Sequence, residues 1–213
     1  MESDAVRNAV KLFRGRGGVL RTKEALALGI HPRTLYHMRD ASIVEQISRG
    51  VYRLASLPPL GEPDLATVAL RVPRAVVCLV SALSYYQITT QLPREVQIAL
   101  PRGMKSPVLH YPPIRVFRFS GAAFTTGIET LRLDAVAGRI YRPEKTVADC
   151  FRFRNKIGMD VAIEALQLAL RDRRITPAHL LHYARICRVE KIMIPYLEAL
   201  LSRFSIAPQR YRP

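Results

Sequence analysis

Four side chains between positions 33 and 39, Arg33, Tyr36, His37 and Arg39, have the chemistry that recognises DNA. An arginine can donate two hydrogen bonds to guanine, and an imidazole can donate to or accept from a base edge in the major groove. A phenol can contact a phosphate or a thymine methyl group, and a second guanidinium beside it can neutralise a phosphate. These residue types predict a surface that reads double-stranded DNA.

The segment that carries them is expected to be a helix with one apolar side. Pro32 stands in the first helical turn, which tolerates a residue without an N–H group. At about 100° per residue, Leu35 and Met38 fall on one side together with Thr34, whose hydroxyl lies within reach of a phosphate. A charged face that is merely solvated and a Tyr36 that packs in the core are the alternative interpretations. The opposite, polar side consists of Arg33, Tyr36, His37 and Asp40.

Two earlier helices complete a helix-turn-helix. Apolar residues recur at helical spacing from Val6 to Phe13, and a glycine-rich segment that starts at Gly15 ends that helix. Thr22 is expected to cap a second helix of barely two turns, which Gly29 stops. The order of helix, short helix, glycine-containing turn and helix is the helix-turn-helix arrangement.

A short hairpin is expected directly after the recognition helix. Ile43–Ile47 and Val51–Leu54 have strand character, and Gly50 in the Ser-Arg-Gly loop between them can adopt the positive φ that a three-residue hairpin needs. Such a hairpin is a wing, with Arg49 at its tip beside the duplex. The predicted DNA contacts are Arg21, Lys23, Arg33, Thr34, Tyr36, His37, Arg39, Arg49 and, if its strand face points outward, Arg53.

The stretch "LRTKEALALGIHPRTLYHMRDASIVEQISRGVYRL", from Leu20 to Leu54, resembles the N-terminal winged helix of AbiEi-type antitoxins, an abortive-infection family of type IV toxin–antitoxin systems. The Leu-Tyr pair in the recognition helix and the closing Arg-Gly-Val-Tyr-Arg-Leu ribbon carry the likeness. The resemblance implies a winged helix-turn-helix in a DNA-binding transcriptional regulator.

A domain boundary is predicted at "LPPLGEP", Leu57–Pro63, because three prolines and a glycine exclude a helix interior or a central strand. The predicted division is a winged-helix domain at 1–57, a linker at 58–63 and a C-terminal domain at 64–213. The fold class is expected to be α+β, in which the larger C-terminal domain has a small antiparallel sheet and a helical bundle. Its elements are expected as helices at 64–72, 76–88, from 143 onward, 160–170, 176–186 and 189–203, and as strands at 95–100, 114–119, 128–133 and 138–141.

The stretch "RIYRPEKTVADCFRFRNKIGMDVAIEALQLAL", from Arg139 to Leu170, extends the likeness to the Pro-Glu-Lys-Thr-x-x-Asp-Cys segment of the antitoxin's C-terminal domain. The resemblance then implies an antitoxin that represses its own operon through an operator with repeated half-sites. It also implies that the protein counteracts a nucleotidyltransferase-like toxin in phage defence, and leaves open whether it binds that toxin directly. No cofactor and no enzymatic activity are implied.

An enzyme, with the winged helix targeting a nuclease-like C-terminal domain, is the rival hypothesis. Glu144, Lys145, Thr146 and Asp149 invite it, but Lys145 and Asp149 are four residues apart and can simply pair on one helix face. A metal-dependent nuclease of the restriction type needs a Glu-x-Lys spacing, whereas Glu144 and Lys145 are adjacent. We therefore expect a structural or antitoxin role for this cluster and no metal site. A regulator without any toxin partner is a third hypothesis.

The net charge of +16, from 33 basic and 17 acidic residues, favours a polyanionic partner. Arg171, Arg173 and Arg174 are a candidate second basic surface, and the tail Arg210–Pro213 is another; a solvated helix end and a frayed terminus are the alternatives. An RNA partner is less favoured, because the aromatic strand motif of an RNA recognition module is missing.

Three widely spaced cysteines, Cys78, Cys150 and Cys187, argue against a disulfide framework and for a reducing compartment. The first residues lack an apolar signal segment, and the longest apolar run, Ala75–Val80, is too short to cross a bilayer. We therefore expect a cytoplasmic protein with no membrane partner.

Overall fold

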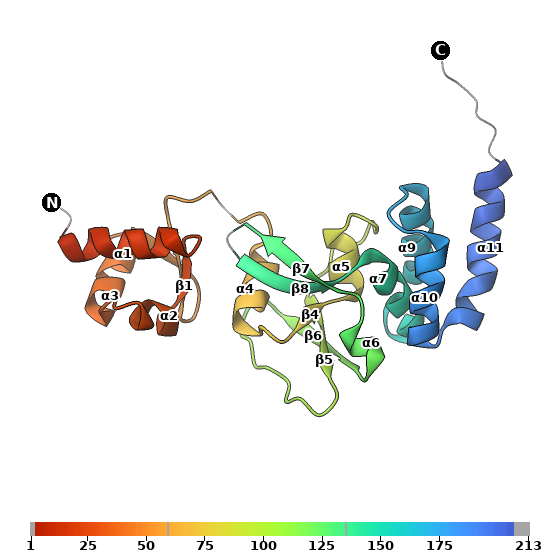
Figure 1. The fold of residues 1–213 in the computed structure, drawn as a ribbon, viewed down its shortest axis with the longest axis horizontal. Coiled ribbons are helices and arrows are strands. Elements are labelled where there is room, and N and C mark those ends of the chain that lie inside the picture. The colour runs from red at the N-terminus through yellow and green to blue at the C-terminus, as the bar shows by residue number, and fades with distance from the viewer. Residues whose placement is uncertain (1–2, 59, 135, 207–213) are drawn as a thin grey trace, which may run out of the picture. The chain divides into compact units, whose positions relative to one another are not determined.

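The computed structural model describes residues 3–58, 60–134 and 136–206. Contacts between Cα atoms divide the chain into two compact units. The predicted α+β class is confirmed, because helices and strands occur in both units (Figure 1). The first unit consists of Met1–Ala75, Pro107–Pro112 and Thr130–Arg139, and the second of Val76–Ser106, Pro113–Glu129 and Ile140–Pro213.

The N-terminal elements form a winged helix-turn-helix with a small antiparallel sheet, in the strand order β1-β3-β2. The sequence did not predict β1, because its three residues are too few to show a strand alternation and Val19 and Leu20 are both buried. The elements along the chain are α1 (Asp4–Gly15), β1 (Val19–Arg21), α2 (Thr22–Ala27), α3 (Pro32–Asp40), β2 (Val44–Ser48) and β3 (Val51–Leu54).

The beginning of α2 differs from the expected cap. Arg21, and not Thr22, is the N-cap residue, because it ends β1 in extended conformation opposite Val51. The carboxylate of Glu24 accepts a hydrogen bond from the Arg21 N–H group at 2.9 Å, which satisfies one of the free donors at the helix start. Thr22 is therefore the first residue of the helix, and its hydroxyl is free for another partner.

The larger sheet has five strands in the order β6-β5-β4-β8-β7, and it is mixed rather than antiparallel, which corrects the prediction. β5 pairs with β6 in parallel, β4 pairs with β8 in parallel, and β4 and β5 are antiparallel. The connection through residues 102–113 returns the chain to the start of β5, and this return makes the β5–β6 pair parallel. The strands are β4 (Val76–Val77), β5 (Val96–Pro101), β6 (Ile114–Phe119), β7 (Ile128–Leu133) and β8 (Val136–Tyr141).

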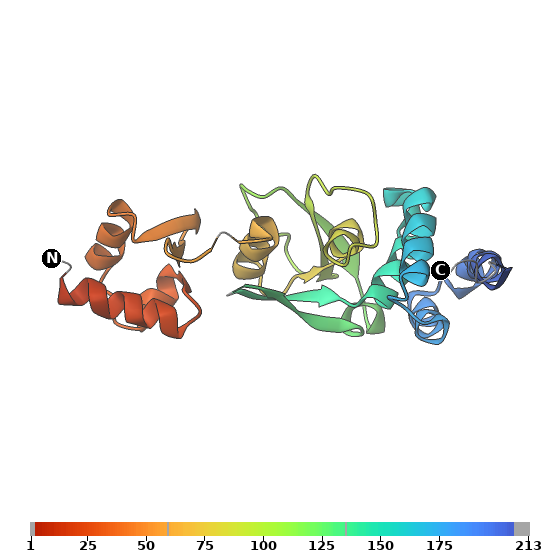
Figure 2. The ribbon, with the colours of Figure 1, turned by 90° about the horizontal axis from the view of Figure 1, so that it is seen from above.

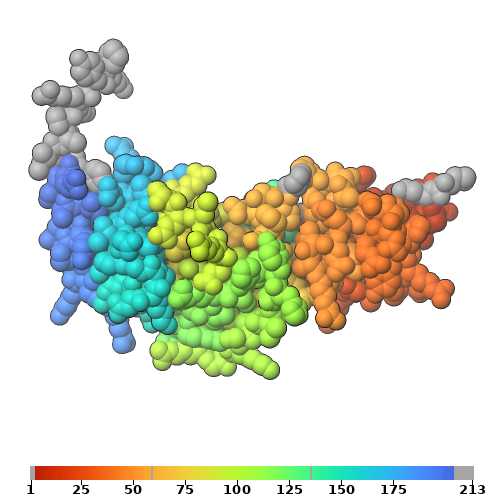
Figure 3. All heavy atoms as spheres, turned by 180° about the vertical axis from the view of Figure 1, so that it is seen from behind, coloured from red at the N-terminus to blue at the C-terminus, as the bar shows by residue number. Residues whose placement is uncertain are grey.

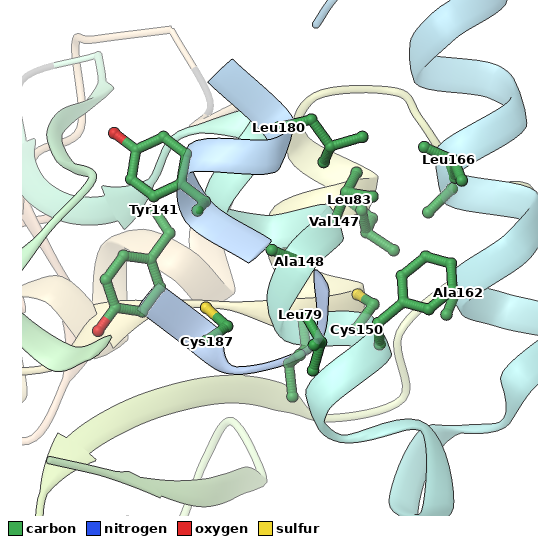
Figure 4. Close-up of a cluster of buried hydrophobic side chains, with 14 of the residues drawn as sticks. Leu79, Leu83, Tyr141, Val147, Ala148, Cys150, Ala162, Leu166, Leu180 and Cys187 are labelled. Atoms are coloured by element: carbon green, nitrogen blue, oxygen red, sulfur yellow. The ribbon is translucent and has the colours of Figure 1, made fainter. Parts of the chain in front are cut away.

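The helix predicted at 76–88 is divided into the short strand β4 and the helix α5, because a continuous apolar run does not distinguish a buried strand from a buried helix. α7, α9, α10 and α11 pack together beside the sheet (Figures 1 and 2). Figure 4 shows the side chains that meet in this core, among them Leu83, Val147, Leu166 and Leu180. The helices are α4 (Pro63–Arg71), α5 (Leu79–Tyr85), α6 (Ala122–Thr125), α7 (Pro143–Arg152), α8 (Arg154–Ile157), α9 (Met159–Arg171), α10 (Pro177–Cys187) and α11 (Glu190–Ile206).

Candidate nucleic-acid interface

The helix α3 has one face in the core and one face in solvent, as its sequence pattern predicts. Leu35 and Met38 are completely buried against a core that includes Phe13 and Ala25. Burying a side chain of this size contributes roughly 1.5–3 kcal/mol, so these two contacts fix the rotation of the helix about its axis. The exposed residues of α3 include Arg33, Tyr36, His37 and Arg39, and Thr34 is half-buried.

The start of α3 is closed by His31. Its Nδ1 atom accepts a hydrogen bond from the Arg33 N–H group at 3.2 Å, and its carbonyl oxygen accepts from the Leu35 N–H group. Pro32 follows at the first helical position, where its fixed φ suits the helix. The backbone that carries Arg33 is therefore fixed in the first turn of α3.

Tyr36 and Arg39 lie together on the solvent side of the helix. The Arg39 guanidinium carbon is 5.3 Å from the centroid of the Tyr36 ring, and Tyr36 is 45% exposed, so it does not pack in the core. Arg39 also donates to the Asp40 carboxylate at 2.9 Å, and this hydrogen bond raises the pKa of the guanidinium. A phosphate that contacts Arg39 would therefore have to share the guanidinium group with the Asp40 carboxylate.

The wing places Arg49 at an exposed turn. Gly50, which follows it, has φ of +73°, the left-handed conformation that glycine adopts without strain. The Gly50 carbonyl oxygen accepts from the Thr22 N–H group at 2.9 Å and from the Thr22 hydroxyl at 3.3 Å, so the wing tip is tied to the start of α2. The guanidinium of Arg71 donates to the Arg49 carbonyl oxygen at 2.6 Å, a cation near the wing that the sequence pattern does not reveal.

Arg53 does not face solvent, which corrects its place among the expected contacts. It is 4% exposed, and its guanidinium pairs with the Glu45 carboxylate on the neighbouring strand. Of the two remaining cations, Lys23 is exposed and Arg21 is half-buried. We therefore leave Arg53 out of the interface, because a phosphate would have to displace Glu45 from a nearly enclosed side chain.

The motif in α7 forms a buried ion pair. Lys145 and Asp149 are both 0% exposed and are joined through Nζ and Oδ2, one helical turn apart. The Lys145 ammonium lies 4.2 Å from the centroid of the Tyr141 ring, and the Cys187 thiol donates to Asp149 Oδ1 at 3.2 Å. Burial raises the pKa of the Asp149 carboxyl, while the Lys145 charge acts in the opposite direction. Thr146, also buried, donates to the Tyr141 carbonyl oxygen at 3.1 Å, so these three residues hold α7 in its core.

Glu144 lies at the edge of this core. It is 8% exposed, and its carboxylate is 3.7 Å from both the Arg142 guanidinium and the His179 ring nitrogen Nδ1. A nuclease centre needs carboxylates that converge on a metal ion, but Asp149 is already neutralised by Lys145. Among residues 3–58, 60–134 and 136–206, no group of three or more His, Cys, Asp or Glu residues is arranged to hold a metal ion.

The candidate second basic surface is exposed at the end of α9. Arg171 pairs with Asp172 at 2.8 Å, whereas Arg173 and Arg174 are exposed beside it. The basic tail at 210–213 lies outside the described residues. Within the part of the chain that the structure describes, no helix combines the length and the apolar character that crossing a bilayer requires.

Comparisons with known proteins agree with the N-terminal geometry. Residues 9–55 match the model of a family described as transcriptional regulator, AbiEi antitoxin, which confirms the resemblance of the winged helix to these antitoxins. No curated protein matches the chain. The crystal structure of the RV2827C protein from Mycobacterium tuberculosis is similar, with a TM-score of 0.55 and 17% sequence identity over 98% of this chain and 83% of that chain. At this identity the likeness concerns the fold alone.

Proposed function

We propose that this protein is an antitoxin that binds DNA, represses the operon that encodes it and counteracts a nucleotidyltransferase-like toxin. The observation that carries the proposal is the exposed face of α3, with Arg33, Tyr36 and His37 directed away from the core in a segment that matches AbiEi antitoxin regulators. The family is regulatory, so the proposal includes no catalytic step.

In this proposal α3 enters the major groove, and Arg33 donates to a guanine. His37 contacts a neighbouring base edge, and Tyr36 contacts a phosphate or a thymine methyl group. Arg39, with Thr34 and the wing residue Arg49, holds phosphates and so sets the position of the helix. The proposal also assigns contacts with the phosphate backbone to Arg21 and Lys23, at the start of α2.

The excess of basic residues supports the proposal that the protein binds DNA. A protein with a net charge of +16 attracts a polyanion over long distance, and each phosphate contact releases counterions. Each such contact contributes about −0.9 to the slope of log K against log salt concentration. Arg173 and Arg174 are proposed as additional contacts to DNA in the C-terminal part.

The division of labour that we propose assigns operator binding to residues 1–57 and neutralisation of the toxin to residues 64–213, with a linker at 58–63. The buried Lys145–Asp149 pair then has a structural role, and antitoxin activity is best sought on the exposed side chains of Arg142 and His179, which flank the Glu144 carboxylate. We place the protein in the cytoplasm, where its DNA is found and where three buried free thiols remain reduced. Its proposed setting is phage defence by abortive infection.

The test is a binding measurement on the promoter region of the operon. Fluorescence anisotropy at several salt concentrations is expected to show binding to that DNA with a steep salt slope, and tighter binding than to a scrambled duplex of equal length. Repeated half-sites in the protected region would indicate two or more copies on DNA. Equal affinity for the promoter and the scrambled duplex would contradict the repressor role.

A second experiment tests the antitoxin role and separates it from plain regulation. A neighbouring gene for a nucleotidyltransferase-like protein is expressed with and without this chain, and the chain is expected to restore growth. Absence of such a gene, or growth arrest that the chain does not relieve, would favour a regulator without a toxin. Metal-dependent cleavage of DNA by the purified protein would favour the nuclease instead.

A further inference from the structure

A cavity of about 520 Å³ lies in the second unit, and all the described residues that line it belong to that unit. Residues 91–95 form one wall, the beginning of β6 forms another, and the end of α8 closes it. This volume lies within the roughly 300–1,000 Å³ that is usual for small-molecule sites. The cavity is large enough for a compound of the size of a mononucleotide.

The cavity is lined by an excess of positive charge. Arg94, Arg115 and Lys156 supply three cations, and Glu95 alone is acidic among the described residues that line the cavity. The Glu95 carboxylate lies 3.5 Å from Arg115 Nη1 and so neutralises that charge only in part. Two uncompensated cations in one hollow favour an anionic ligand.

Contacts within the protein hold two of these cations in place. The Arg115 guanidinium carbon lies 5.2 Å from the centroid of the Phe117 ring, and Arg115 Nη2 donates to the Lys156 carbonyl oxygen at 3.5 Å. The Lys156 ammonium lies 5.9 Å from the centroid of the Phe153 ring. These contacts restrict the two exposed side chains, and any such restriction reduces the conformational entropy that is lost on binding.

A buried amide adds a directional donor. Gln97 is 7% exposed, and its side-chain oxygen accepts a hydrogen bond from the Val80 N–H group at 2.9 Å. This bond fixes the orientation of the amide and leaves its nitrogen to donate to a ligand oxygen. Gln97 and Val80 both line the cavity.

The wall formed by residues 91–95 is anchored to α9. The Glu164 carboxylate accepts hydrogen bonds from the Thr90 N–H group and hydroxyl, at 3.3 and 2.5 Å, and from the Thr89 hydroxyl at 3.2 Å. Figure 3 shows this yellow-green loop lying against the cyan helix. Leu92, 88% exposed on the same wall, is available for the apolar part of a ligand.

We propose that this cavity binds a phosphate monoester. A monoester carries up to two negative charges near neutral pH, which matches the excess of two cations, whereas a phosphodiester in a nucleic-acid backbone carries one. The Glu95 carboxylate can accept hydrogen bonds from hydroxyl groups on the same ligand. The monoester belongs either to a free phosphorylated small molecule or to the terminal phosphate of a nucleic-acid strand. The site goes beyond the proposed function and does not depend on it.

The experiment is isothermal titration calorimetry of the full chain with adenosine 5′-monophosphate. Salt is kept at about 0.15 M, where charges more than about 8 Å apart are screened. Adenosine monophosphate is expected to bind and adenosine is not. The double variant Arg94→Ser with Lys156→Gln is expected to bind the monophosphate at least about 10-fold more weakly, because it loses two charge-assisted contacts.

The matched control carries the same substitutions at exposed positions outside the cavity, Arg102→Ser with Lys191→Gln, and should keep wild-type affinity. Glu95→Gln keeps a side-chain oxygen that can accept from ligand hydroxyl groups but removes the negative charge beside Arg115, so it is expected to tighten binding by about 3-fold. Equal weakening in the control, equal binding of adenosine, or no binding of the monophosphate at about 1 mM would overturn the proposal.

Two oligonucleotides separate the sources of the phosphate. A single strand with a 5′-phosphate is compared with the same strand carrying a 5′-hydroxyl. Tighter binding of the phosphorylated strand, lost in the cavity variant, assigns the site to strand ends; equal binding of the two strands assigns it to a free small molecule. Operator affinity, measured on the same variant, is expected to be unchanged, so failure of this site is distinguishable from failure of the proposed function.

Discussion

The ammonium group of Lys145 and the carboxylate of Asp149 pair inside the core, with neither side chain exposed to solvent. The Tyr141 ring and the Cys187 thiol enclose the pair, so each charge depends on the other for its stabilisation. This arrangement makes the motif a part of the fold, although its residue types are those of many catalytic sites.

Replacement of one partner alone is expected to destabilise the protein strongly. Lys145→Met leaves a buried carboxylate without its cation, and a loss of about 3–5 kcal/mol in the free energy of unfolding follows. Joint replacement of Lys145 by Met and Asp149 by Leu is expected to recover most of this loss. Urea unfolding, followed by circular dichroism, measures the free energy of unfolding of each variant. A double variant whose loss equals the sum of the two single losses would contradict the buried-pair interpretation.

The three cysteines are expected to resist thiol reagents in the folded protein. Cys78, Cys150 and Cys187 are buried, and desolvation raises the pKa of each thiol, so the reactive thiolate is scarce at pH 8. Titration with a chromogenic disulfide is expected to be slow for the native chain and complete in guanidinium chloride. Rapid reaction of any one thiol in the native state would show that its segment opens.

Arg33→Ala is expected to weaken operator binding by about 1–3 kcal/mol and to relax the preference at one base pair. Arg49→Ala is expected to weaken binding to all duplexes alike and to reduce the salt slope by about 1, because the proposed function assigns this wing arginine to a phosphate. Anisotropy titrations against a set of single-base operator variants distinguish the two effects. Unchanged affinity and preference in Arg33→Ala would show that α3 does not read bases.

The variant Arg53→Met tests whether Arg53 stabilises the wing from inside the protein and makes no contact with DNA. Since Arg53 is buried and paired with Glu45, its loss is expected to lower the melting temperature while leaving the affinity of the remaining folded protein for DNA unchanged. Thermal unfolding and anisotropy are measured on the same preparation. A reduced salt slope with an unchanged melting temperature would return Arg53 to the interface.

The orientation of α3 could be predicted because a helix of period 3.6 sorts Leu35 and Met38 from Arg33 and His37 without further information. The direction of the Arg53 side chain could not be predicted, because all four residues of β3 are buried and the strand shows no alternation of buried and exposed positions. In that case the neighbouring strand, through Glu45, decides which way the guanidinium points.

The mixed sheet and the cavity could not be predicted for a different reason. Parallel pairing of β5 with β6 depends on the path of the loop between them, which local preferences do not determine. Arg94, Arg115 and Lys156 are far apart in the sequence and meet only when β6 and α8 are in place. No single stretch of the chain therefore carries a signal for the cavity.

The pairing of Val77 with Ile140 has a consequence for how the protein is made. The winged helix is complete at Leu54 and can fold while the rest of the chain is still being synthesised on the ribosome. The middle of the five-stranded sheet, by contrast, has to wait until Ile140 has emerged, with β5 and β6 exposing apolar residues in the meantime. During translation the winged helix is thus ready first, whereas β4 lacks its parallel partner until the roughly sixty residues between Val77 and Ile140 have also been made.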